Sequence, residues 1–402
     1  MCGLSPYVVI SLRSSHDPPG TPLNDPHDLA RPNIFEIDLD AIASNVLEIR
    51  RFVGTDVRIF AAMKANAYGF GLLEVAPVIQ QAGVDTICVA DLSDAVRLRN
   101  DGITIPILLY AGNRVDDALV RAVEDMRLTG TVTDIEVARC YSSLARGPVR
   151  VFAKVDVGLE RLGIPFDQAA EVVCEVAHLP SLHLEGVYTH LHVPDPSGPL
   201  EYVQWQLQRF NAVLEKVRAA GVAVNIAVAA STPVVPRYGA SGLNGIDVGR
   251  LIYGSLRRDR DATGSMNIRS AFRSLRSRLI QCRPVARTAH LAEAPFPIRP
   301  GMRMGIAPIG FADGIDFLNC GFALVRGCAA PLLGAPSLEH TRLDLTEIPQ
   351  ARVGDEVAFV GSQEGSEITP DDVLAHLGVA QPARMATSVR ESVRRVYLRS
   401  AT

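Results

Sequence analysis

Short apolar runs alternate with amphipathic helical stretches along the first two thirds of the chain. The runs typical of buried strands are residues 57–63, 86–90, 105–110, 128–133, 149–155, 182–189, 224–230 and 246–248. The helical stretches between them include residues 72–82, 93–101, 116–125, 167–177 and 200–219. Eight buried strands separated by helices predict a (β/α)8 barrel of the TIM type, and a doubly wound α/β sheet is the main alternative.

The sequence pattern at the two ends of the chain differs from the strand and helix alternation of the middle. Residues 14–32 are rich in proline and polar residues and predict an irregular lead-in, after which 35–39 predicts a short strand and Asp40 caps a helix to about Phe52. After about Asn267, short strand-like pieces separated by Gly and Pro predict a mostly β domain. We therefore expect an irregular segment at 1–32, an α/β barrel at 33–266 and a C-terminal β domain at 267–402.

Composition and charge exclude several classes of protein. The formal net charge is −4, which provides no basic field for nucleic acid or for an anionic membrane. No run of 18 apolar residues and no signal-like start are present. The seven cysteines are widely spaced without a CxxC pair, which argues against a disulfide frame or a structural metal. We expect a cytoplasmic protein with neither metal, membrane nor nucleic-acid partner.

Lysine is almost absent from this chain. Of the 40 basic residues only Lys64, Lys154 and Lys216 are lysines. Genome base composition is the simplest explanation, but a lysine retained in such a chain also suggests an ammonium group that must lose its proton, which arginine cannot do. Lys216 lies in an amphipathic run and is most simply a solvated helix residue, whereas the other two end the first and fifth predicted strands.

The carboxyl ends of barrel strands are where function gathers. Lys64 is followed by AYGFG, which favours an amine nucleophile over a snorkelling surface lysine. Lys154 and Asp156 are two positions apart in a predicted strand and therefore point to the same face, where we expect an ion pair, either functional or structural. Ser231 ends the seventh strand, and the loops after strands seven and eight commonly bind phosphate. A lysine nucleophile opposite a phosphate site is what pyridoxal phosphate requires.

Five motifs together resemble the alanine racemase family of fold type III pyridoxal-phosphate enzymes. They are EIDLDAIASN (36–45), AAMKANAYGFG (61–71), AKVDVGLERLGI (153–164), THLH (189–192) and IGFADG (309–314). The resemblance runs in consistent order from about Arg31 across nearly the whole chain. It implies a cofactor-binding barrel, a C-terminal β domain, and a head-to-tail homodimer in which the partner's β domain completes each active site.

The resemblance also implies roles for individual residues. Lys64 matches the aldimine lysine, which is also a racemising base, and Arg161 matches an arginine that faces the cofactor hydroxyl and the substrate carboxylate. Lys154 matches a lysine, carbamylated in some relatives, that orients this arginine. The remaining cofactor-binding positions implied by the match are Tyr68, His190, Ser231, Gly249, Arg250 and Tyr253.

Several positions depart from the family pattern. Aligned on Tyr253-Gly254, Asp247 replaces the arginine that donates to the pyridine nitrogen, and a carboxylate there would keep that nitrogen protonated. A register shift that uses Arg250 is the alternative. The tyrosine that acts as the second base has no counterpart in residues 288–296, where His290 and Glu293 are the candidate replacements. Departures also occur at 337–340 and near 383–384, all on the wall that the partner would contribute.

These observations predict a pyridoxal-phosphate-dependent amino-acid racemase or epimerase with Lys64, Arg161 and His290 as its catalytic residues. Two alternatives stay open. The stronger electron sink expected from Asp247 suits another carbanion reaction, such as that of a decarboxylase, an aldolase or a transaminase-like enzyme. A cofactor carrier without turnover would need the same lysine and phosphate contacts. The substrate is expected to be an amino acid whose side chain the sequence does not identify.

Overall fold

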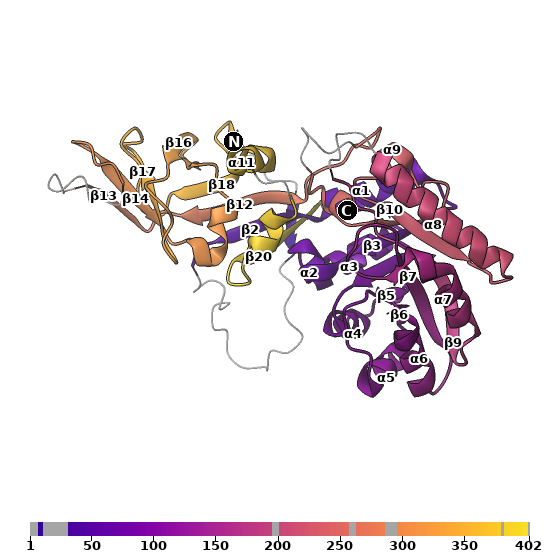
Figure 1. Cartoon of the computed structure of the whole chain (residues 1–402). Helices are drawn as coiled ribbons and strands as arrows, with labels where there is room; N and C mark the ends of the chain where they lie inside the picture. The colour runs from indigo at the N-terminus through magenta and orange to yellow at the C-terminus, as the bar shows by residue number, and fades with distance from the viewer. Residues whose placement is uncertain are drawn as a thin grey trace, which may run out of the picture. The chain divides into compact units, whose positions relative to one another are not determined.

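A computed structural model describes residues 31–194, 201–256, 263–285, 296–378 and 382–400, together with the backbone of residues 7–10 (Figure 1). The chain divides into two compact units. One unit is Ala41–Arg269, and the other combines the described residues up to Asp40 with those from Ser270 onward. The two units are therefore built from interleaved parts of the sequence.

The unit from Ala41 to Arg269 is a closed barrel of eight parallel strands. In barrel order they are β3 (Arg58–Ala62), β4 (Thr86–Val89), β5 (Ile107–Leu109), β6 (Thr129–Val132), β7 (Val149–Asp156), β9 (Leu182–Tyr188), β10 (Ile226–Ser231) and β11 (Gly245–Val248). Pairing of β11 with β3 closes the ring. The short β8 (Ile164–Pro165) extends the edge of β7. The predicted (β/α)8 barrel is thereby confirmed.

Helices connect the strands on the outside of the barrel. They are α1 (Leu39–Val53), α3 (Leu72–Gln81), α4 (Leu92–Asn100), α5 (Asp117–Asp125), α6 (Ile135–Leu144), α7 (Phe166–His178) and α8 (Glu201–Ala219), with the short turns α2 (Lys64–Tyr68), α9 (Val235–Tyr238) and α10 (Arg250–Tyr253). Helix α6 is not among the helical stretches named from the sequence, although the alternation of strands and helices leaves room for it between β6 and β7. Asp134 starts it, because its carboxylate accepts a hydrogen bond from the amide of Val137.

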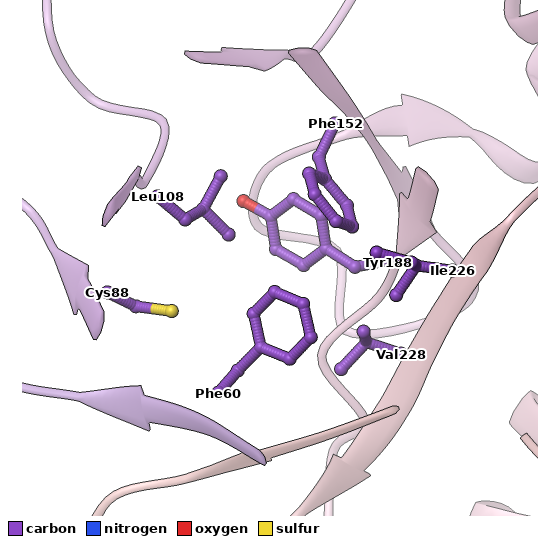
Figure 2. Close-up of a cluster of buried hydrophobic side chains, with 7 residues drawn as sticks. All are labelled: Phe60, Cys88, Leu108, Phe152, Tyr188, Ile226 and Val228. Carbon is purple, nitrogen blue, oxygen red and sulfur yellow. The ribbon is translucent and has the colours of Figure 1, made fainter. Parts of the chain in front are cut away.

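The barrel interior is filled by a layer of large side chains (Figure 2). The layer consists of buried residues from six of the strands: Phe60, Cys88, Leu108, Phe152, Tyr188, Ile226 and Val228. The rings of Phe60 and Phe152 meet edge to face with centroids 5.6 Å apart. The interior is therefore a packed core rather than a channel, and ligand chemistry must take place above it, at the carboxyl ends of the strands.

The second unit is mostly β, as predicted. Its larger sheet has the order β1 (Tyr7–Ile10), β20 (Arg394–Ser400), β2 (Ile34–Asp38), β12 (Phe272–Arg278), β18 (Glu356–Gln363), β15 (Phe322–Val325) and β16 (Cys328–Pro331), with β19 (Ser366–Ile368) on β18. A smaller sheet joins β13 (Gln281–Pro284), β14 (Arg303–Ala307) and β17 (Thr341–Asp344). Two short helices, α11 (Pro370–Leu377) and α12 (Arg384–Ser388), complete it.

The boundaries differ from the predicted ones at the amino-terminal side. The barrel was expected to begin at residue 33, but β2 pairs with β12 and β20 and so lies in the β unit. Phe35 and Ile37 are fully buried there, and Phe35 packs on Phe272 with ring centroids 4.5 Å apart. The segment 1–32 was expected to be irregular, yet β1 pairs antiparallel with β20.

None of the helices that the structure describes combines the length and the apolar character needed to cross a bilayer. The longest of them, α8, carries charged residues in both its first and its last turn.

Candidate active site

The segment directly after the first barrel strand has an unusual backbone. Four consecutive non-glycine residues of α2, Ala65 to Tyr68, have φ between 53° and 56°. This left-handed turn costs about 1–2 kcal/mol per residue. Hydrogen bonds offset part of that cost: the amide of Leu72 donates to Asn66 Oδ1 at 2.8 Å, and Gly69 N donates to the carbonyls of Ala65 and Asn66. Strain of this kind is stored where a site must hold side chains in place, here those of Lys64 and Tyr68.

The two predicted strand-end lysines lie over tyrosine rings of the barrel. Lys64 Nζ is 5.7 Å from the ring centroid of Tyr110, and Lys154 Nζ is 5.5 Å from that of Tyr188. Only 8% of Lys154 is exposed. Burial, and next the charge of Arg161, lower the pKa of Lys154 to about 8, so a substantial fraction of this amine is neutral near physiological pH.

Asp156 does not form the ion pair that the sequence predicts. Among the described residues its partners are backbone amides: Oδ1 accepts from residues 158, 159 and 160, and Oδ2 accepts from Arg161 N at 2.8 Å. Partial burial acts to raise the pKa of Asp156, but these hydrogen bonds outweigh it and lower the pKa. The carboxylate thus shapes the loop that presents Arg161 instead of neutralising Lys154. The expectation failed because β7 ends at Asp156, where the chain turns back over this side chain.

Asp247, from β11, is bonded to a residue that the sequence did not single out. The hydroxyl of Tyr110 donates to Asp247 Oδ1 at 2.7 Å. Burial raises the pKa of Asp247, while the Tyr110 hydrogen bond and the charges of Lys64 and Lys154 oppose that rise. Tyr110 ends a predicted strand, and no sequence signal links it to a carboxylate 137 positions away.

Small residues and hydroxyls lie at the ends of three neighbouring strands, β9, β10 and β11. Ser231 Oγ and Thr189 Oγ1 are buried and have no hydrogen-bond partner among the described residues. A Cβ at Gly249 would lie 2.6 Å from the hydroxyl of Tyr68, so only glycine leaves room between that hydroxyl and the backbone. We call the group of Ser231, Thr189 and Gly249 the cradle. Gly249 N donates to Thr232 Oγ1 at 3.3 Å. Sequence reasoning missed Thr189 and Thr232, although each is adjacent to a predicted site residue.

This donor set fits a phosphate monoester. Such a group needs several hydroxyl and amide donors and close backbone approach, which Ser231, Thr189 and the glycine at 249 supply. Burial, and next the negative charge of Asp247, raise the pKa of Tyr68 to about 12, so its phenol is neutral and able to donate. The residues present therefore suit pyridoxal phosphate.

Two other predicted residues, His190 and Tyr253, have different surroundings. His190 is half-buried, and burial followed by the charge of Arg161 lowers its pKa to about 4, so it is neutral above pH 5. Tyr253 is fully buried: its hydroxyl donates to the carbonyl of Ala62 at 3.0 Å and its ring stacks on Phe70. The hydroxyl of Tyr253 thus holds the end of β3, and its ring lies against that of Tyr68 with centroids 5.2 Å apart; its predicted contact with the cofactor stays a prediction.

Arg250, the alternative partner for a pyridine nitrogen, is half-buried at the start of α10. His290 and Glu293 lie outside the described residues.

A parallel (β/α)8 barrel with one buried and one half-buried lysine and an open hydroxyl cradle at the carboxyl ends of its strands, joined to a β unit, defines a class of barrel enzymes with a lysine-centred site. Comparison with known proteins specifies the family. The model for the alanine racemase N-terminal domain matches residues 37–257, and that for the C-terminal domain matches 273–397. The chain belongs to the alanine racemase family and is an enzyme of the amino-acid racemase type.

Individual relatives align over nearly their whole length. Alanine racemase 2 of Caldanaerobacter subterraneus subsp. tengcongensis is 30% identical over 92% of this chain and 96% of its own. Alanine racemase of Desulfosudis oleivorans is 32% identical over 90% of this chain and 95% of its own. The crystal structure of alanine racemase from Bacillus anthracis with bound L-Ala-P is 25% identical, with a TM-score of 0.81 over 92% of this chain and 96% of that chain.

Proposed function

We propose that this protein is a pyridoxal-phosphate-dependent amino-acid racemase in which Lys64 both attaches the cofactor and moves a proton at the substrate's Cα. The observation that carries the proposal is the placement of Lys64 by a strained left-handed turn that also positions Tyr68 beside the open cradle at Gly249. The similarity to named alanine racemases over at least nine tenths of the chain supports it. The same similarity favours racemisation over a decarboxylase, an aldolase, a transaminase-like enzyme or a carrier.

Pyridoxal phosphate, when bound, supplies an aldehyde for an amine and an electron-withdrawing ring that acidifies the substrate's Cα–H bond. The surrounding residues have distinct tasks. Ser231, Thr189 and the Tyr68 phenol bind phosphate oxygens, and Gly249 lets the backbone approach them. Arg161, presented by the loop that Asp156 organises, binds the substrate carboxylate.

Proton movement requires a base whose proton is labile near neutral pH. Lys64 Nζ takes or returns the Cα proton on one face of the substrate. Lys154, with its pKa lowered to about 8, orients Arg161, and the neutral fraction of its amine reduces the repulsion between these two basic side chains. His190 stays neutral and accepts or donates a single hydrogen bond without adding charge.

The opposite face of the substrate needs a second acid. We propose His290 for this role, contributed by the β domain of a partner subunit in a head-to-tail homodimer. The proposal is supported by the family membership and by the missing tyrosine in residues 288–296. We also propose a cytoplasmic location, which agrees with the absence of a cysteine frame in the sequence.

Covalent labelling tests the assignment of Lys64. The protein is reconstituted with pyridoxal phosphate, reduced with borohydride and mapped by mass spectrometry, and we expect the label on Lys64. Lys64→Ala should abolish both the cofactor absorbance band and the label. Lys216→Ala is the matched control, because Lys216 is an exposed residue of α8. A protein that binds no cofactor, or that carries the label elsewhere, contradicts the proposal.

The reaction is tested with single enantiomers of an amino-acid panel in deuterium oxide. Racemisation yields the antipode labelled at Cα. Exchange on one face yields only labelled starting enantiomer, and decarboxylation or aldol cleavage yields a lighter product. Loss of antipode formation with retained one-face exchange in His290→Ala would support the second acid. Unchanged racemisation in that variant would rule it out.

A further inference from the structure

The position of Asp247 in the sequence predicts that it lies at the cofactor's ring nitrogen, but its hydrogen-bond partner Tyr110 has no part in the residue roles described so far. This pair joins the end of β5 to β11, on different sides of the barrel, through a 2.7 Å hydrogen bond from the phenol to Oδ1. Both residues are half-buried, and they border the same small space as Phe60, Cys88 and other side chains of the barrel core layer. Asp247 Oδ2 accepts no hydrogen bond from any described residue and is not among the fully buried polar atoms without a partner, so it is free to accept one from a ligand.

The ionisable groups around Asp247 act in opposite directions. Two cations, Lys64 and Lys154, favour its ionised form, and enclosure by the barrel favours its neutral form. The nearby thiol of Cys88 and the phenol of Tyr188 have raised pKa values because they are buried, and both stay uncharged. A direct hydrogen bond from Tyr110 is therefore the stabilising contact that does not depend on the charge of a lysine.

The difference between a lysine charge and a phenol hydrogen bond matters because the charge of Lys64 does not stay constant during the proposed reaction. If Lys64 attaches the cofactor and moves protons, its charge changes within each turnover, and its support for the Asp247 carboxylate changes with it. A phenol does not lose its proton in this pH range, since burial raises the pKa of Tyr110 well above its ordinary value. Tyr110 thus provides constant support where Lys64 provides variable support.

Resting on the proposed function, we propose that Tyr110 is a positioning residue: by donating to Oδ1 it keeps Asp247 ionised and directs Oδ2 toward the protonated nitrogen of the cofactor's ring. The Tyr110–Asp247 pair then sets how strongly that nitrogen holds its proton. A carboxylate without the phenol would revert toward its neutral form in this enclosed site and would cease to stabilise a cationic ring.

The chain offers a matched control for this hydroxyl. Tyr188 is a buried tyrosine whose ring centroid lies 6.3 Å from that of Tyr110, in the same cluster. Its hydroxyl forms a hydrogen bond with Thr131 Oγ1 at 3.3 Å, whereas the hydroxyl of Tyr110 donates to Asp247. Tyr188→Phe therefore removes an equivalent buried hydroxyl without touching the proposed contact.

The test uses the holoenzyme reconstituted with pyridoxal phosphate carrying 15N in the ring. The 15N chemical shift, followed against pH, reports protonation of the ring nitrogen directly, independently of turnover. Because a hydrogen bond to a charged group is usually equivalent to about one to two pKa units, we expect Tyr110→Phe to lower the pH at which this nitrogen loses its proton by about that amount. Asp247→Asn should lower it further, and Tyr188→Phe should leave it at the wild-type value.

The outcomes separate this inference from the proposed function. The Tyr110→Phe variant could carry the reduced cofactor on Lys64 and yet show a ring nitrogen that loses its proton at the same pH as in the wild type. That result would overturn the role of Tyr110 and leave the racemase assignment intact. Absence of any Lys64 label in the wild type would overturn both. If Tyr110→Phe does not fold, the infrared difference between wild-type and Asp247→Asn holoenzymes decides: an ionised carboxylate band is expected, and a carboxylic acid band would overturn the inference.

Discussion

Replacing the buried Lys154 by methionine should stabilise the barrel at neutral pH. The side chain is 8% exposed, and burial together with the charge of Arg161 disfavours its protonated form. Methionine has a similar length and no charge, so Lys154→Met removes the desolvation penalty and retains most of the packing. The substitution should impair catalysis, because Arg161 loses its neighbour, while improving the free energy of unfolding.

The magnitude follows from the pKa. A lowering from the ordinary 10.5 to about 8 corresponds to about 3 kcal/mol, since each pKa unit is worth about 1.4 kcal/mol. This penalty is fully present below pH 8, where the lysine is protonated in both states. Between pH 8 and 10.5 the unfolded chain binds the proton that the folded chain has lost, so wild-type stability rises with pH through this window. Asp247 loses a nearby cation in the variant, which cancels part of the gain and leaves about 1–3 kcal/mol at pH 7.

The assay is urea unfolding of cofactor-free protein in bicarbonate-free buffer, followed by tryptophan fluorescence. Trp205 is the single tryptophan of the chain and lies in α8, so its emission reports the barrel unit specifically. Lys154→Met should show a higher urea midpoint at pH 7 and converge with the wild type near pH 10. Lys216→Met, at an exposed site, should match the wild type at both pH values. A midpoint for Lys154→Met below that of the wild type at pH 7 would refute the reasoning.

Three further predictions concern other parts of the chain. Asp313 is 1% exposed and accepts two hydrogen bonds from Arg31, so Arg31→Met leaves a buried carboxylate without its cation and should destabilise the β unit by about 2–4 kcal/mol. Hydrogen exchange of the β2 amides measures this loss, and unchanged protection of those amides would contradict the prediction. Gly158 has φ +137°, and a Cβ there would lie 2.6 Å from Trp205, so Gly158→Ala should shift the emission spectrum of Trp205, whereas an identical spectrum argues against this packing. The pKa of His190 is lowered from 6.5 to about 4, so between these pH values the unfolded state binds more protons, and stability rises with pH and is lost as the pH is lowered from 6.5 to 4. His190→Gln should remove about 2–3 kcal/mol of this acid-induced loss, and an acid unfolding profile identical to that of the wild type would count against it.

The barrel could be predicted from sequence because its strands are buried on both faces. Runs such as 149–155 and 182–189 are apolar enough to identify without partners, and β7 and β9 lie within a residue or two of those bounds. Helix α6 is not among the stretches named from the sequence, although Asp134 provides a capping signal. The placement of β2 could not be foreseen either, since a five-residue strand carries no mark of which sheet it joins.

The site was predictable where chemistry is local and unpredictable where it depends on distant pairs. Lys64 and Tyr68 belong to one short motif, so their association was expected. Tyr110 meets Asp247 only because the barrel closes, and the partners of Asp156 depend on how the loop after β7 turns. Contacts of this kind are properties of the folded chain and leave no trace in local spacing.

The position of β2 has a consequence for the order of folding during synthesis. This strand leaves the ribosome before any of the barrel, but its neighbours β12 and β20 are made after the barrel is complete. The barrel, encoded by one continuous stretch, is able to fold while the chain is still growing, as amino-terminal domains generally do. The β unit has to wait, with the apolar side chains of Phe35 and Ile37 unburied until the last strands emerge. A nascent chain stalled after the barrel would therefore present an intact barrel and one strand without a sheet.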